Sequence, residues 1–139
     1  MLKKIEIKKS LAKTLRAFGQ FLPVVSGVLL LLAMIDAAVP KSFYSQFFSG
    51  DKLIDSIVGA ALGSVFAGSP VASYVLGGGF LAQGVSLIAV AAFILAWVTV
   101  GIVQLPAESM MLGKKFALAR NTVSFLMSII IAILTVLIL

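Results

Sequence analysis

The residues that could carry out chemistry in this chain are few, and their types narrow the choice at once. The 139 residues include no cysteine and no histidine. This composition excludes thiolate nucleophiles, disulfides, Ser-His-Asp catalysis and zinc sites built from imidazole or thiolate. The glycine triplet at 77–79 lacks the lysine and the strand context of a nucleotide-binding loop. We therefore expect no enzymatic activity, no cofactor and no metal site.

The polar residues of interest lie where apolar segments are interrupted. Gly68-Ser69-Pro70 cuts one apolar stretch near its middle, and a second proline, Pro106, follows another apolar run. In transporters, the N-termini of half-helices point at anionic groups, and unwound carbonyls and helix C-termini hold cations. We expect a site for a small anionic or polar solute, or a break that only packs the segment. The candidate solute-binding residues are Gly68, Ser69, Pro70, Ser73, Gln104 and Glu108.

The composition indicates that these breaks belong to an integral membrane protein. The chain is 61% hydrophobic and only 12% charged, and its mean hydropathy is +1.18. Soluble domains carry about 25% charged residues. The basic residues cluster at the edges of apolar runs, which is typical of membrane orientation and not of nucleic-acid binding. The expected partner is the lipid bilayer.

The apolar pattern predicts an all-α fold with three transmembrane helices and one broken re-entrant hairpin in a single membrane domain. A basic amphipathic leader lies on the cytoplasmic leaflet or only fixes orientation. The connection 40–52 carries Phe43, Tyr44, Phe47 and Phe48 and serves as an interfacial anchor or as an aromatic gate over a binding site. The expected segments are the leader 1–17, the spans 18–39, 85–103 and 121–139, the anchor 40–52 and the hairpin 53–84.

The hairpin 53–84 competes with a single span kinked at Pro70. Its first helix should end near Gly68, and its second should begin at Pro70 with Ser69 as N-cap. The glycine triplet should then loosen or end that second helix. Two pieces of about 14 and 12 residues are each too short to span. The hairpin puts nine of eleven basic residues inside, six before the first span and three ahead of the last, which favours it.

Several residues allow both a structural and a functional interpretation. Asp36 is an interfacial acid or a buried functional acid. Trp97 packs in its span or stacks on a ligand. Glu108 occupies the first turn of a short helix at 107–118, where the helix dipole favours an acid, or it forms a proton or cation site with Gln104. Pro23 is expected in the first turns of its span, where a proline costs least.

Small residues recur at helical spacing in two segments. Gly59 and Gly63 belong to a small face that lets backbones approach closely. A second stripe closes the chain and either joins helices or lines a pore; it comprises Asn121, Ser124, Ser128, Ala132 and Thr135. We assign Gly59, Gly63, Ser124 and Ser128 to helix packing.

The segment over roughly residues 50–139 resembles the second half of the predicted permeases that include organoarsenical efflux proteins. The resemblance rests on AGSPVASYVLGGGFLAQG, on the following span, and on the proline near a polar turn before GKKFALARN. Full-length members of that family look as if they are built from two related halves, and this chain has the length of one half. The resemblance implies transport but no particular cargo, and the absence of cysteine removes thiol-dependent arsenic chemistry.

These features together predict a half-length subunit of a small-solute permease in the plasma membrane, with a cytoplasmic N-terminus. One half cannot easily enclose a path, so we expect a parallel homodimer or a pair with a second half-length subunit. The alternative function is a non-transporting scaffold or accessory subunit whose small-residue faces bind partner helices.

Overall fold

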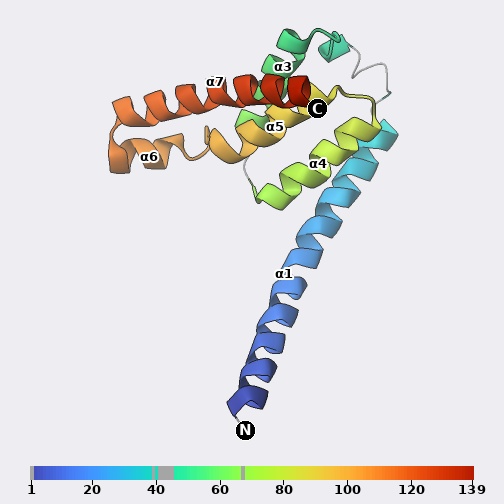
Figure 1. Ribbon diagram of the computed structural model, residues 1–139, viewed down its shortest axis with the longest axis vertical. Coiled ribbons are helices and arrows are strands. Elements are labelled where there is room, and N and C mark those ends of the chain that lie inside the picture. Colours follow the sequence, from blue (N-terminus) through green and yellow to red (C-terminus); the bar gives the residue numbers. More distant parts are fainter. Residues whose placement is uncertain (1, 39, 41–45, 67) are drawn as a thin grey trace.

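The computed structural model describes residues 2–38, 40, 46–66 and 68–139, without the side chains of residues 2–7, 24, 32, 35 and 36. Within these ranges the regular structure is entirely helical (Figure 1). The helices are α1 (Leu2–Ala38), α3 (Lys52–Val65), α4 (Pro70–Ala82), α5 (Leu87–Thr99), α6 (Leu105–Leu112) and α7 (Lys114–Ile138). The all-α prediction is confirmed for the described residues.

Helix α1 joins the expected leader and first span into one continuous element of 37 residues. Pro23 therefore lies inside the helix and not in its first turns, so that expectation is wrong. A proline inside a helix removes one hydrogen bond of the ladder, and α1 continues through Pro23 despite this cost. The N-terminal half of α1 projects away from the other helices, while Val28, further along, packs beside α4 (Figure 1).

Helix α5 is the centre of the fold, and α3 packs along it in the same direction. The contact is closest at Gly59 and Gly63. A Cβ atom on Gly59 would lie 2.1 Å from the Ala89 carbonyl oxygen, and one on Gly63 would lie 2.2 Å from that of Phe93. No side chain fits at such distances, so glycine is what allows the two backbones to touch.

Helix α4 packs on α5 in the opposite direction, so α3 and α4 form a hairpin that straddles α5. Ser69 caps α4 by accepting a hydrogen bond from the Ala72 amide, and Pro70 begins the helix, as the sequence predicts. The glycine triplet does not interrupt α4, which corrects the expectation that it would. Gly77 instead packs against Val90 of α5, and the contact keeps the helix regular.

A hydrogen bond joins the two ends of the hairpin. Asp55 in the first turn of α3 is 1% exposed, and its Oδ2 atom accepts from the Ser86 hydroxyl at 2.7 Å. Ser86 is the N-cap residue of α5. The carboxylate therefore approaches the positive end of the α5 dipole, which favours an anion there.

The expected span 85–103 is shorter and the last helix is longer than the sequence predicts. Helix α5 ends at Thr99, and residues 100–104 are not helical. The chain resumes as α6, which ends at Leu112, so Gly113 divides the short helix expected at 107–118. Gly113 has a φ of 89°, a conformation that glycine adopts without strain. Helix α7 then begins at Lys114, ahead of the expected span 121–139.

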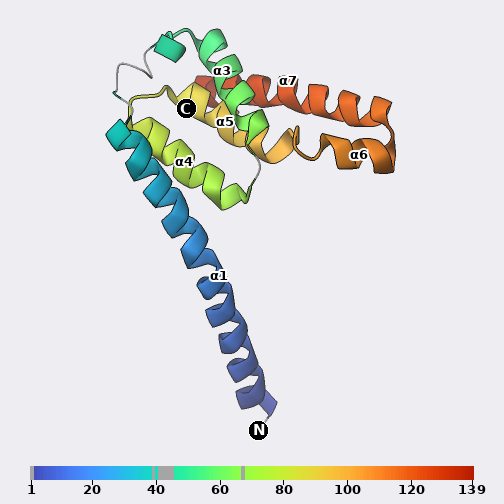
Figure 2. The same ribbon diagram turned by 180° about the vertical axis from the view of Figure 1, so that it is seen from behind.

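Helices α5 and α6 both run antiparallel to α7, one after the other (Figure 2). The first core cluster lies between α3, α5 and α7 and consists of Ala60, Ile88, Ala92, Ala96, Val100, Ile129 and Ala132. Most of these side chains are small, so the three helices lie close together.

Two described helical segments are long and apolar enough to cross a membrane. They are Lys8–Leu31 within α1, of 24 residues, and α7, of 25 residues. Helices α4 and α5 are apolar but shorter. In the expected interfacial connection, Phe43 and Tyr44 lie outside the described residues, while Phe47 and Phe48 approach α3 and α5.

The packing of α3 on α5 predicts different outcomes for two glycine substitutions. Gly59→Ala forces the backbones apart, and we expect a loss of about 1–3 kcal/mol in the free energy of unfolding. Gly78→Ala is the matched control, because a Cβ at Gly78 meets nothing within 4 Å. It should leave stability unchanged or raise it by about 0.4–1 kcal/mol. Thermal unfolding in detergent, followed by Trp97 fluorescence, measures both; equal midpoints would contradict the close packing.

Candidate functional site

The break between α3 and α4 meets the break between α5 and α6. At the first break, Phe66 and Ser69 have extended backbones, with ψ angles of 144° and 146°. At the second, Val100 is extended at ψ 115°. The indole nitrogen of Trp97, in the last turn of α5, donates to the Gly68 carbonyl oxygen at 3.4 Å. Two interrupted helices are thus brought to one point.

A small cavity of about 110 Å³ lies between the two breaks. Gly68 and Pro70 line it from the hairpin, Gly101 and Gln104 line it from the second break, and Arg120 lines it from α7. Freed backbone groups, an amide side chain and a guanidinium thus border the same space, while Trp97 and Val98 supply an apolar wall. Such a surface suits a ligand that has a polar group and an apolar part.

Helix α7 satisfies the polar groups exposed by the second break. Asn121 is 6% exposed, and its side-chain oxygen accepts from the Gly101 amide at 2.9 Å. The Asn121 amide nitrogen donates to the Ala117 carbonyl oxygen at 3.0 Å and to Glu108 Oε2 at 3.3 Å. A single buried asparagine therefore links the unwound segment to α6 and α7.

Glu108 and Arg120 form a two-point ion pair between α6 and α7. The Arg120 Nε atom donates to Glu108 Oε2 at 3.0 Å, and its Nη2 atom donates to Oε1 at 2.5 Å. The side chains are 35% and 20% exposed for Arg120 and Glu108. Bidentate pairs of this kind fix geometry as well as charge. Glu108 lies in the first turn of α6, as the sequence predicts, and it also positions Arg120 at the cavity.

The structure brings together some of the candidate solute-binding residues and not others. Gly68, Pro70 and Gln104 line the cavity. Ser69 caps α4, and Ser73 is 0% exposed with its hydroxyl donating to the Pro70 carbonyl oxygen at 2.6 Å. Glu108 reaches the cavity only through Arg120. The hydroxyl groups of Ser69 and Ser73 thus make local contacts within α4.

The four residues assigned to helix packing differ in what they contact. Gly59 and Gly63 face α5, as described above. On α7, Ser128 is 2% exposed and donates to the Phe125 carbonyl oxygen at 2.8 Å. Ser124 is half-buried beside Thr99 in a shallow groove. The side chain of Asp36 lies outside the described residues, so both interpretations of it stay open.

Trp97 belongs to an aromatic cluster at the hairpin tip. Its ring stacks on Phe66 with centroids 5.2 Å apart and meets Phe93 edge-on at 5.4 Å. The indole is 8% exposed. Packing therefore accounts for most of its surface, yet the same ring forms part of the cavity wall.

Sequence reasoning missed Arg120 and Asn121 as parts of this site. Arg120 was expected in a basic loop ahead of the last span, but it lies within α7. The missed signal is Val98-Thr99-Val100-Gly101, three β-branched residues and a glycine, all weak helix formers. That run predicts a break inside an apolar segment, but hydropathy does not register it.

No protein-family model, curated protein or solved structure matches this chain. The permease resemblance described above therefore rests on the residues quoted for it.

Removal of the Asn121 side chain tests its part in holding the second break. Asn121→Ala leaves the Gly101 amide without its acceptor, and we expect a loss of about 1–3 kcal/mol in the free energy of unfolding. Thr122→Ala is the control, since the exposed Thr122 hydroxyl bonds only within its own helix, to the Leu118 carbonyl oxygen. Denaturation in detergent measures both variants. A loss confined to Thr122→Ala would show that the break does not depend on Asn121.

Proposed function

We propose that this chain is a subunit of a small-solute permease in the plasma membrane, and that it acts as an oligomer. The solute binds where the α3–α4 break meets the α5–α6 break. The observation that carries the proposal is this meeting of two interrupted helices around a cavity bordered by Gly68, Gln104 and Arg120. Membrane transporters bind their solutes at discontinuous helices near the bilayer midplane.

Helix lengths support this arrangement within a bilayer. Helix α7, with 25 residues, is about 37 Å long and exceeds the hydrocarbon thickness of about 30 Å. Helices α3 and α4, with 14 and 13 residues, are each about 20 Å long and cannot cross alone. The α5–break–α6 segment runs beside α7 and serves as the second span, between α1 and α7. The three-span fold with a hairpin is therefore consistent with these lengths.

The bond between Asp55 and Ser86 supports a re-entrant hairpin over a kinked span. It joins the first turn of α3 to the residue after the hairpin, so both ends of the hairpin are on one side. A single kinked span would separate these ends by the thickness of the bilayer. In this orientation the start of α7, with Lys114 and Lys115, faces the cytoplasm together with the N-terminus, as the positive-inside rule favours.

The size of the cavity supports an oligomer. One chain encloses about 110 Å³, whereas small-molecule sites commonly measure about 300–1,000 Å³. A second copy, or a second half-length subunit, supplies the missing walls. The polar groups available from this chain are the Gln104 amide, freed backbone groups and the part of the Arg120 guanidinium that is not bound to Glu108, which suit an anionic or polar part of the solute.

A substitution at the hairpin tip tests transport. Gly68 lines the cavity, and even a Cβ there would lie 3.1 Å from the Trp97 ring, so Gly68→Leu crowds the proposed site. We expect at least a tenfold loss of flux in proteoliposomes screened with small anionic and polar solutes. Gly78→Leu is the matched control on the same hairpin, in open space, and should retain flux. If the wild-type assembly moves no solute class, the accessory-subunit alternative replaces this proposal.

The mass of the purified assembly tests the need for a second subunit. The chain has a mass of 14.6 kDa, and we expect a multiple of it, or a stable complex with a second half-length protein. Light scattering in detergent measures the protein mass in the same preparation that is used for flux. A monomer that transports would contradict the oligomer, and crosslinks found only between antiparallel copies would contradict the parallel arrangement.

A further inference from the structure

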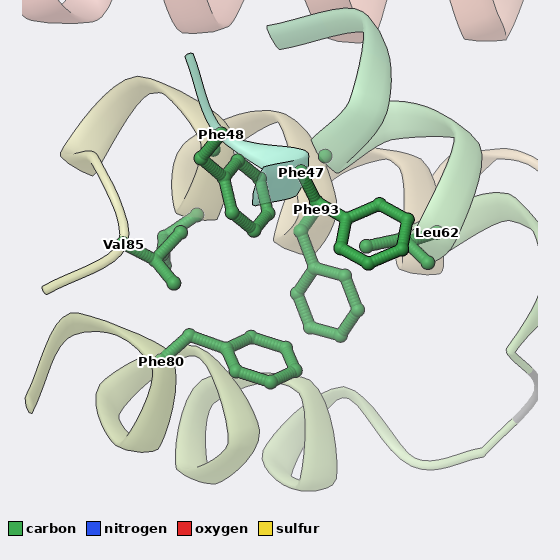
Figure 3. Close-up of a pocket in the computed structure, with 9 residues that line it drawn as sticks. Phe47, Phe48, Leu62, Phe80, Val85 and Phe93 are labelled. Carbon is green, nitrogen blue, oxygen red and sulfur yellow. The ribbon is translucent and has the colours of Figure 1, made fainter. Parts of the chain in front are cut away.

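A second pocket lies between the two arms of the hairpin, away from the solute cavity. Helices α3 and α4 both pack on α5, and the gap between them has a volume of about 150 Å³. Its walls include Phe47, Phe48, Leu62, Phe80, Val85 and Phe93, whose side chains surround the space shown in Figure 3. Every side chain that lines this hairpin pocket contains carbon and hydrogen only, so it offers nothing to a polar ligand.

The dimensions of the hairpin pocket suit a hydrocarbon segment. An apolar protein cavity of about 150 Å³ stays free of water and binds benzene or xenon. The side chains that line such a space beside the bilayer gain dispersion contacts when a flexible hydrocarbon enters it. Apolar side chains nearby are open to the surroundings, with Ile57 46% and Leu81 42% exposed. Under the proposed placement, the medium next to them is the acyl region of the membrane.

The depth of one exposed lysine, Lys52, points to a phospholipid; its neighbour Asp51 caps α3, where its carboxylate accepts from the Leu53 amide at 2.8 Å. Lys52, which is exposed, begins α3. Gly59, which lines the pocket, follows about two helical turns later, or about 10 Å along the axis. The polar layer of a bilayer leaflet is about 5–8 Å deep. If the phosphate binds at Lys52, the first part of the acyl chain lies at the depth of the pocket.

We propose that one acyl chain of a membrane phospholipid occupies the hairpin pocket, with its phosphate at Lys52. The lipid fills the gap between α3 and α4 and supports both arms against α5. This inference rests on the proposed membrane placement, but it does not depend on transport.

The lipid that copurifies with the full chain tests the proposal. Val85 is 5% exposed and faces the pocket, so Val85→Phe fills it. Leu87, nearby on α5, is 45% exposed and does not line the pocket, so Leu87→Phe is the matched control. After delipidation washes, quantitative mass spectrometry should find about one phospholipid per chain in wild type and control, and at least fivefold less in Val85→Phe. Equal lipid in all three would overturn the proposal.

A measurement in vesicles covers the case in which Val85→Phe does not fold. Trp97 is the only tryptophan of the chain. In a Trp97→Phe background, Phe80→Trp puts the fluorophore at the pocket, and Leu87→Trp puts it at the exposed control position. Phospholipid brominated on its acyl chains should quench the half-buried position 80 at least half as strongly as position 87. Quenching at position 80 that stays below a tenth of the control would overturn the proposal.

Lys52→Gln separates the phosphate contact from the acyl contact. We expect it to lower the retained phospholipid at least threefold while leaving the quenching pattern in vesicles unchanged, and equal retention would remove Lys52 from the site. Lipid retention and flux fail independently. A lipid-bound chain that moves no solute contradicts only the permease, and a transporting chain without the lipid contradicts only this inference.

Discussion

The contact between α3 and α5 is the constraint on which the rest of the fold depends. Gly59 and Gly63 place the backbone of α3 directly on the Ala89 and Phe93 carbonyls. In the proposed membrane placement there is no hydrophobic driving force between helices, so close van der Waals contact holds them together. Once α3 is fixed in this register, Asp55 meets Ser86 at one end of the hairpin, and the hairpin tip meets Trp97 at the other.

Side chains satisfy the backbone groups that the two breaks set free. A freed backbone group in a medium without water costs several kcal/mol unless protein satisfies it. Three side chains do so here: Asn121 accepts from the Gly101 amide, Ser69 accepts from the Ala72 amide, and Trp97 donates to the Gly68 carbonyl oxygen. Two of these three bonds join segments that are distant in sequence. The breaks are therefore parts of the tertiary structure and not local irregularities.

The sequence predicts those features of the fold that local chemistry determines. Apolar runs and composition indicate helices, and Ser69 with Pro70 marks the start of α4. It fails where a helix end depends on distant contacts. At the end of α5, the weak helix formers Val98 to Gly101 mark a break but not its position, and the bond from the Gly101 amide to Asn121 spans 20 positions.

The candidate site divides in the same way. Gly68, Pro70 and Gln104 are apparent from the chain, because prolines and glycines beside polar residues mark breaks. Arg120 is not, because its place at the cavity follows from pairing with Glu108 on another helix. The apolar hairpin pocket leaves no mark in the sequence at all, since phenylalanines in an apolar segment are ordinary core residues.

If the chain carries solute, the distribution of contacts indicates where it can move. The hairpin is fastened to α5 by backbone contact along two turns, so α3 and α5 move as one body. Helix α6 is fastened to α7 by the Glu108–Arg120 pair. The two bodies also meet across the first core cluster, where Ile129 and Ala132 of α7 pack against α3 and α5, and residues 100–104 join α5 to α6. Gly101 and the extended Val100 can absorb a change in backbone angles at small cost. Rotation there would change the cavity between Gly68 and Gln104 only together with the packing of α7 on α3 and α5.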